Sequence, residues 1–241
     1  MPVTLAPVGP YQVNVTLVDL ANPAGTIVPS NTRADGELFP FQRDIALELS
    51  KQKSAALIAR SGVGKMEIAI AAARTHLTPD SEVERVVILT NPNLVSQWAR
   101  EITKTTLPAD VFDAYATREA GERWRNYSAG AQRWTVVPYS LLINDTDVLL
   151  TTMNNSLLLI DAMFQVKNPE AQRSVATLAL AKAAAHRLTL LSTPQNYMLA
   201  QWHHVIKTAL DPNETDPRSL DRAVADSYQM IGEHHILTIT Q

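Results

Sequence analysis

The chain carries the sequence Leu57-Ile58-Ala59-Arg60-Ser61-Gly62-Val63-Gly64-Lys65-Met66. It joins an apolar run to a Gly-rich turn and a lysine, which are the parts of a phosphate-binding loop. Such a loop ordinarily ends in Ser or Thr, whose hydroxyl binds magnesium, but Met66 stands at that position, and a thioether is a poor ligand for a cation that prefers oxygen. The segment therefore predicts a nucleotide phosphate site and argues against magnesium binding. Its predicted phosphate contacts are Ser61, Gly62, Val63, Gly64 and Lys65.

Composition limits the classes of protein that this chain can represent. Its 241 residues are 46% hydrophobic, enough to bury one large core or two small ones. The sequence has no cysteine, no apolar run long enough to span a membrane and no signal-peptide pattern at its start. We therefore expect a soluble, cytoplasmic protein that does not engage membranes.

Net charge argues against nucleic-acid binding through bulk electrostatics, because the formal value is -3. The densest basic stretch, residues 118–133, carries four arginines interleaved with Trp124 and Tyr127. Arginine and aromatic side chains together can follow a nucleic-acid backbone and stack on bases. Glu119 and Glu122 in the same stretch are equally consistent with a solvated helix whose aromatic side chains face the core.

Hydrophobic patterning predicts an α/β fold with a mostly parallel sheet and helices on both faces. Short apolar runs alternate with helical patterns from residue 41 onward, as expected for strands that are buried on both sides. The predicted strands cover residues 55–59, 86–89, 135–137, 157–160, 188–191 and 236–240, and the predicted helices cover 42–51, 65–76, a segment ending at 104, 139–144, 169–185, 199–210 and 219–231. Residues 1–36 alternate with period two and predict a small β-rich arm, and residues 211–218 read as a linker.

One acidic residue follows a predicted strand at a place suited to a phosphate site. Asp161 directly follows the apolar run 157–160. Carboxyl ends of parallel strands meet at one edge of the sheet, where open α/β sheets bind ligands and where an acid can hold phosphate-bound magnesium. An ordinary turn residue would look the same, but the order of loop and acid along the chain favours the ligand role.

Six segments in order resemble the first RecA-like lobe of superfamily 2 helicases, most closely the Swi/Snf-type DNA translocases. They are residues 38–42 (Gln motif), 59–66 (motif I), 90–98 (motif Ia), 137–142 (the strand and Tyr-Ser turn before motif II), 159–164 with 167–169 (motif II and its Lys-Asn-Pro tail) and 190–196 (motif III). The resemblance implies a RecA-like P-loop NTPase sheet. It also implies a helicase-like lobe over 37–212, which the β-rich arm over 1–36 precedes and an extension over 213–241 toward a second lobe follows.

The resemblance also implies ligands, partners and residue roles. Gln42 corresponds to the residue that recognises adenine, so the implied nucleotide is ATP. The segments that resemble motif Ia and the Tyr-Ser turn imply that Asn93, Gln97, Tyr139 and Ser140 lie along nucleic acid, which we expect to be DNA. Asp161 is what remains of the magnesium-binding acid of motif II. A second helicase lobe or another protein is the implied partner.

The departures from the family pattern indicate a degenerate nucleotide site. The family has Glu after the motif II Asp, where it positions the attacking water, and this chain has Ala162. A methyl group neither accepts a proton nor orients water, so no catalytic set is intact. We expect a helicase-like scaffold or nucleotide-binding subunit with little ATPase activity of its own. The alternatives are an active ATP-dependent translocase lobe completed by another chain, and a simple nucleotide-binding module, which the order of motifs disfavours.

Overall fold

A computed structural model of the chain describes residues 3–4, 12–17, 38–161, 163–192, 199–213 and 235–240. The strands in these ranges form one sheet in the order β1-β2-β9-β3-β8-β7-β4-β6-β5. Their bounds are Val3–Thr4 (β1), Gln12–Leu17 (β2), Ser54–Ile58 (β3), Arg85–Thr90 (β4), Val111–Asp113 (β5), Trp134–Pro138 (β6), Ser156–Ile160 (β7), His186–Leu191 (β8) and His235–Thr240 (β9). The expected α/β class is confirmed.

The sheet is parallel from β3 to β5 and antiparallel at its other end. Neighbouring strands between β3 and β5 all pair in parallel, whereas β9 pairs antiparallel with both β3 and β2, and β1 pairs antiparallel with β2. The predicted β-rich arm therefore contributes strands to the same sheet. The division of the chain into segments 1–36, 37–212 and 213–241 stays a prediction.

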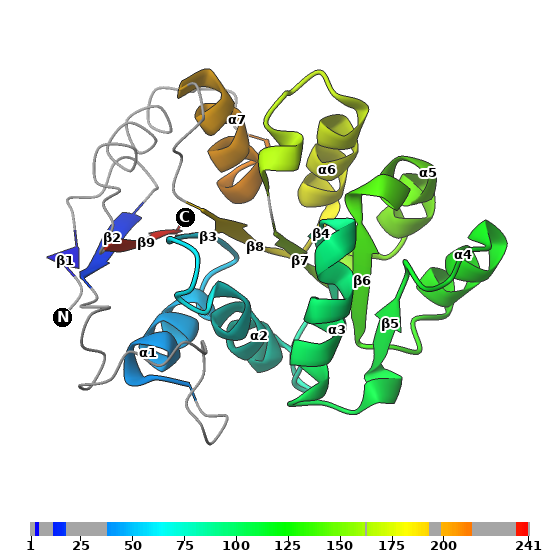
Figure 1. Cartoon of the computed structure of the whole chain (residues 1–241), viewed down its shortest axis with the longest axis horizontal. Helices are drawn as coiled ribbons and strands as arrows, with labels where there is room; N and C mark the ends of the chain where they lie inside the picture. The colour runs from blue at the N-terminus through cyan, green and yellow to red at the C-terminus, as the bar shows by residue number, and fades with distance from the viewer. Residues whose placement is uncertain are drawn as a thin grey trace.

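Helices cover both faces of the sheet (Figure 1). The helices are Pro40–Leu49 (α1), Lys65–His76 (α2), Val95–Thr103 (α3), Ala120–Ala129 (α4), Tyr139–Leu150 (α5), Gln172–Ala183 (α6) and Leu199–Leu210 (α7). Short 3₁₀ turns lie at Pro92–Leu94 (η1), Pro108–Asp110 (η2), Met153–Asn155 (η3) and Met163–Val166 (η4). None of the helices in the described ranges is long and apolar enough to cross a bilayer.

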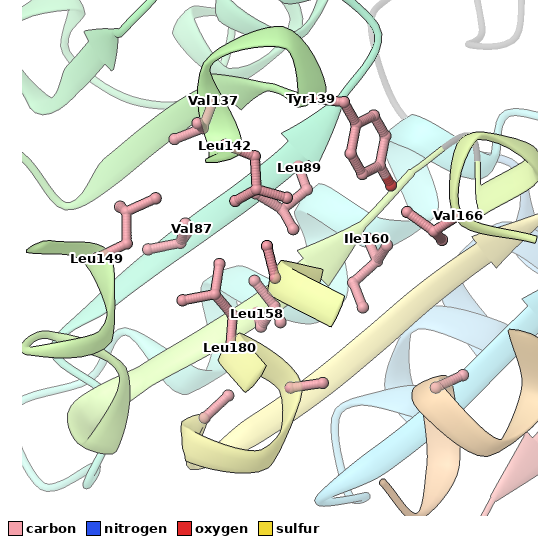
Figure 2. Close-up of a cluster of buried hydrophobic side chains, with 14 of the residues drawn as sticks. Val87, Leu89, Val137, Tyr139, Leu142, Leu149, Leu158, Ile160, Val166 and Leu180 are labelled. Atoms are coloured by element: carbon pink, nitrogen blue, oxygen red, sulfur yellow. The ribbon is translucent and has the colours of Figure 1, made fainter. Parts of the chain in front are cut away.

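Two apolar cores lie on opposite faces because successive strand side chains point to opposite sides of a sheet. In β7, Leu157 and Leu159 pack with the first three helices, whereas Leu158 and Ile160 belong to the core of the other face. Figure 2 shows this second core, in which Val87, Leu89 and Val137 from the strands meet Leu142, Leu149 and Leu180 from α5 and α6. Burial on both faces explains why these strands read as continuous apolar runs.

The structure corrects several predicted boundaries. Helix α5 continues to Leu150, beyond the predicted end at residue 144, because three side chains of α4 satisfy the carboxylate of Asp145. Helix α6 begins at Gln172, after a turn in which the Asn168 side chain accepts a hydrogen bond from the Glu170 amide. Strand β5 has only three residues, too few to give a pattern in the sequence. The predicted helix over 219–231 lies outside the described residues.

Candidate functional site

The Gly-rich loop joins β3 to α2 and has the backbone of a phosphate cradle. Gly62 and Gly64 have φ values of 88° and 86°, in the left-handed region that disfavours residues with a Cβ. Gly64 is the N-cap of α2, and its carbonyl accepts the Ile68 amide hydrogen bond at 3.0 Å. A helix that begins in this way directs its first amides and its positive dipole end toward the loop. The predicted loop between strand and helix is thus present.

Lys65 places its ammonium group against the loop that precedes it. Its Nζ donates hydrogen bonds to the carbonyl oxygens of Ala59 at 2.7 Å and Arg60 at 2.9 Å. Burial lowers the pKa of Lys65 to about 8, and the nearby negative charge of Asp161 opposes this shift. The lysine is therefore a desolvated cation whose donors are held by backbone oxygens, and an anion in the loop offers it a stronger partner.

Gln42 ties the start of α1 to the same loop. Its Nε2 donates to the Val63 carbonyl at 3.0 Å, and its Oε1 accepts from the Phe39 amide at 2.9 Å. The side chain is completely buried. The Nε2 atom thus holds the loop at Val63, while Oε1 caps the start of α1 at Phe39. The adenine-binding role of Gln42 stays a prediction.

Asp161 lies at the carboxyl end of β7, where its carboxylate is bound by two buried side chains. Its Oδ2 accepts hydrogen bonds from Trp98 Nε1 at 2.8 Å and Thr90 Oγ1 at 3.1 Å. Its backbone is fixed as well, since the amide donates to the Leu89 carbonyl and the carbonyl accepts from the Tyr139 hydroxyl. The acid is thus at the predicted edge of the sheet, in a set of hydrogen bonds that the sequence did not predict.

The residues that are present do not fit a magnesium ion of the kind that helicase lobes use. The Met66 side chain packs against the apolar core formed by α1, α2 and α3, so position 66 offers a thioether in an apolar setting. One carboxylate oxygen of Asp161 already accepts two hydrogen bonds from protein groups. Magnesium requires oxygen ligands in near-octahedral geometry. Met66 supplies no oxygen, and Oδ2 of the one carboxylate, Asp161, is already engaged by Trp98 and Thr90. Ala162 lies outside the described residues.

The predicted nucleic-acid residues lie at one edge of the sheet but differ in exposure. Strands β4 and β6 are adjacent and parallel, so η1 with α3 and the start of α5 meet at their carboxyl ends. Asn93 and Ser140 are exposed there and Gln97 is half-buried. Tyr139 is 4% exposed, and its ring belongs to the core drawn in Figure 2. Asn93 and Ser140 are therefore accessible to a ligand. The Tyr139 hydroxyl instead donates a hydrogen bond to the backbone carbonyl of Asp161.

The basic stretch over residues 118–133 contains a buried ion pair. Arg123 donates through Nε and Nη2 to the carboxylate of Asp145 at 2.9 and 3.0 Å, and both side chains are buried. Trp124 Nε1 and the Tyr127 hydroxyl donate to the same carboxylate. Arg123 and Tyr127 therefore fasten α4 to α5 and are not available to nucleic acid. In the sequence, the signal of this network is an acid, Asp145, within the largely apolar segment 139–150, which also contains Asp147.

Comparison with known proteins identifies the fold. No protein-family model matches the sequence, and no curated protein matches it either. Among solved structures, the SWI2/SNF2 ATPase core of Sulfolobus solfataricus in complex with dsDNA is similar with a TM-score of 0.58 and 15% identity, over 86% of this chain and 42% of that one. The Hef helicase domain of Pyrococcus furiosus is similar with a TM-score of 0.54 and 19% identity, over 70% of this chain and 35% of that one.

The chain thus spans less than half the length of either solved structure. The order of motifs read from the sequence and the similarity in structure agree. This chain has a RecA-like α/β fold, similar to the folds of these two structures.

Proposed function

We propose that this chain is a helicase-like lobe with a degenerate nucleotide site, which binds nucleotide phosphates and serves as a scaffolding subunit of a nucleic-acid-processing complex. The observation that best supports this proposal is the contrast between the phosphate-binding loop and the positions where magnesium would be bound. The loop keeps both left-handed glycines and the lysine, whereas Met66 packs into the core and Asp161 accepts hydrogen bonds from Trp98 and Thr90. Such a site can hold phosphate but lacks the groups that activate water.

In this proposal, the nucleotide is ATP, its phosphates contact Ser61 to Lys65, and Gln42 lies nearest to the base. Lys65 leaves the carbonyls of Ala59 and Arg60 when phosphate is bound, because an ion pair with phosphate is stronger than a hydrogen bond to a peptide oxygen. The loop then uses its amides and this lysine together. The cytoplasmic location expected from the composition belongs to the same proposal.

The proposed partners are DNA and a second lobe. The similar SWI2/SNF2 core is in complex with dsDNA, and both similar structures extend well beyond the region that they share with this chain. In this chain Asn93, Gln97 and Ser140 form the proposed DNA contacts at the carboxyl edge of the sheet. A second lobe or another protein would complete the nucleotide site from outside.

Calorimetric titration with ATP tests the nucleotide part of the proposal. The wild-type chain is expected to bind, and Lys65→Ala is expected to weaken binding by about tenfold or more, because it removes a charge-assisted contact. Arg74→Ala is the matched control, since Arg74 is an exposed cation in the last turn of the same helix. Equal affinities for wild type and Lys65→Ala would contradict the assignment of the loop.

Titration with a fluorescent DNA duplex tests the partner part. Replacing Asn93 and Ser140 by Ala together is expected to weaken binding by several-fold at low salt, and Arg125→Ala on α4 is expected to have little effect. An unchanged affinity for the double variant would remove these residues from the proposed DNA surface.

A further inference from the structure

The donor set around the loop points to the form in which a nucleotide is bound. Helicase lobes bind nucleotide as a magnesium complex, and the present residues do not fit that ion. Two cations belong to the loop itself, Lys65 and the exposed Arg60. Arg60 lies between β3 and α2, and Lys65 is the first residue of α2, among the amides that begin the helix. The loop therefore provides positive charge of its own where a family member relies on the metal.

The environment of Asp161 also indicates that the site does not bind magnesium. A carboxylate that binds a cation directly or through water needs oxygen lone pairs directed at that cation. Here Oδ2 accepts from an indole and a hydroxyl, and both donor side chains, Trp98 and Thr90, are completely buried. Buried donors of this kind are fixed by packing, and they stabilise the negative charge in the way that a cation otherwise would.

We infer that this site takes the metal-free polyphosphate of a nucleotide, with Arg60 and Lys65 neutralising the phosphates in place of magnesium. The inference rests on the proposed function, since it assumes that the loop binds phosphate at all. Magnesium bound to the same phosphate oxygens competes with Arg60 and Lys65 for them and gains no oxygen ligand from Met66. Formation of the magnesium–ATP complex in solution therefore lowers the affinity of ATP for this site.

Under this inference, removing the charge of Asp161 has the opposite effect on nucleotide affinity from its effect in a magnesium site. In a magnesium site the acid is a ligand, and its loss weakens binding. In a metal-free site its charge repels the phosphates, so Asp161→Asn strengthens binding. The amide retains an acceptor oxygen for Trp98, which preserves the main contact to α3.

Calorimetric titration of the full chain with ATP, in excess EDTA and in excess magnesium chloride, tests the inference. ATP in EDTA is expected to bind the more tightly. Arg60→Ala is expected to weaken binding in EDTA by about tenfold, and Asp161→Asn to strengthen it by about threefold. Arg74→Ala is the control for loss of a cation, and the melting temperature of each variant in the absence of nucleotide verifies folding.

The outcomes separate this inference from the proposed function. Tighter binding in magnesium, or weaker binding by Asp161→Asn, overturns the metal-free site but leaves nucleotide binding through Lys65 in place. The absence of ATP binding in both solutions overturns the two together. The variant Met66→Thr adds a second criterion, because a restored hydroxyl is expected to reduce or reverse the preference for EDTA.

Discussion

The indole nitrogen of Trp98 lies 2.8 Å from Oδ2 of Asp161, so a buried side chain of α3 binds the acid at the end of β7. Thr90 adds a second hydrogen bond to the same oxygen. The residue that most suggests metal chemistry in the sequence is therefore part of the packing between a helix and the sheet. This contact is the main reason to assign Asp161 a structural role at this site.

Trp98→Phe is expected to destabilise the fold by more than the cost of replacing a buried indole with the smaller phenyl ring. An aromatic ring is kept, but the carboxylate of Asp161 loses a donor, and a hydrogen bond to a charged group contributes about 1.5–3 kcal/mol. Urea unfolding of Trp98→Phe, of Asp161→Ala and of the double variant measures the coupling, because each single change removes one partner of the hydrogen bond. Strictly additive free energies would show that the contact contributes nothing.

The stability of the free protein is expected to rise with pH through the titration of Lys65. The folded-state pKa is about 8, below the ordinary value of 10.5, so between these values the unfolded chain binds more protons than the folded one. The free energy of unfolding then increases with pH in that window. Urea unfolding at pH 7.5 and 9.5 is expected to show this gain for the wild type relative to Lys65→Met. Parallel pH profiles of the two proteins would argue against a desolvated lysine.

His76 is expected to make the fold sensitive to acid. Burial, together with the nearby His186, lowers the pKa of His76 from 6.5 to about 4. Its ring lies 4.6 Å from that of His186. The unfolded chain takes up the proton first as pH falls from 6.5 to 4, so stability declines across this window. Melting temperatures between pH 7 and 4 should fall less steeply for His76→Gln, and an unchanged slope would refute this assignment.

Asp145→Ala is expected to be severely destabilising. It leaves the buried guanidinium of Arg123 without its counter-charge, and breaking a buried pair from one side costs about 3–5 kcal/mol. Asp147→Ala on the exposed side of the same helix is the matched control, with an expected change within about 0.5 kcal/mol. Equal urea midpoints for the two variants would mean that the pair is not formed.

The sequence predicts the sheet well because its strands are buried on both faces. Runs such as 157–160 are continuously apolar, and the loop over residues 59–65 carries glycines where the backbone is left-handed. Elements with weak patterns were missed. Strand β5 has three residues at the edge of the sheet, and α5 contains the polar pair Asn144-Asp145, which resembles a helix end until Arg123 is known to cover it.

The candidate site can be predicted from the sequence only in part, because some of its contacts join residues that are distant in the sequence. Local spacing shows that a loop and an acid follow buried strands, which is enough to expect them at one edge. Hydrogen bonds between residues distant in sequence, such as Trp98 with Asp161 and Gln42 with Val63, depend on how helices pack on the sheet. Trp98 is completely buried in the core. Its polar nitrogen gives it the second role that the pattern does not reveal.

The proposed lack of ATPase activity is tested by one rate. It is the rate of phosphate release from ATP by the purified chain, measured with magnesium and duplex DNA present. We expect a rate indistinguishable from that of Lys65→Ala, because position 66 carries no hydroxyl for magnesium and, in the proposed correspondence with motif II, Ala162 stands in place of the glutamate. Turnover that disappears in Lys65→Ala would contradict the account and establish an active ATPase.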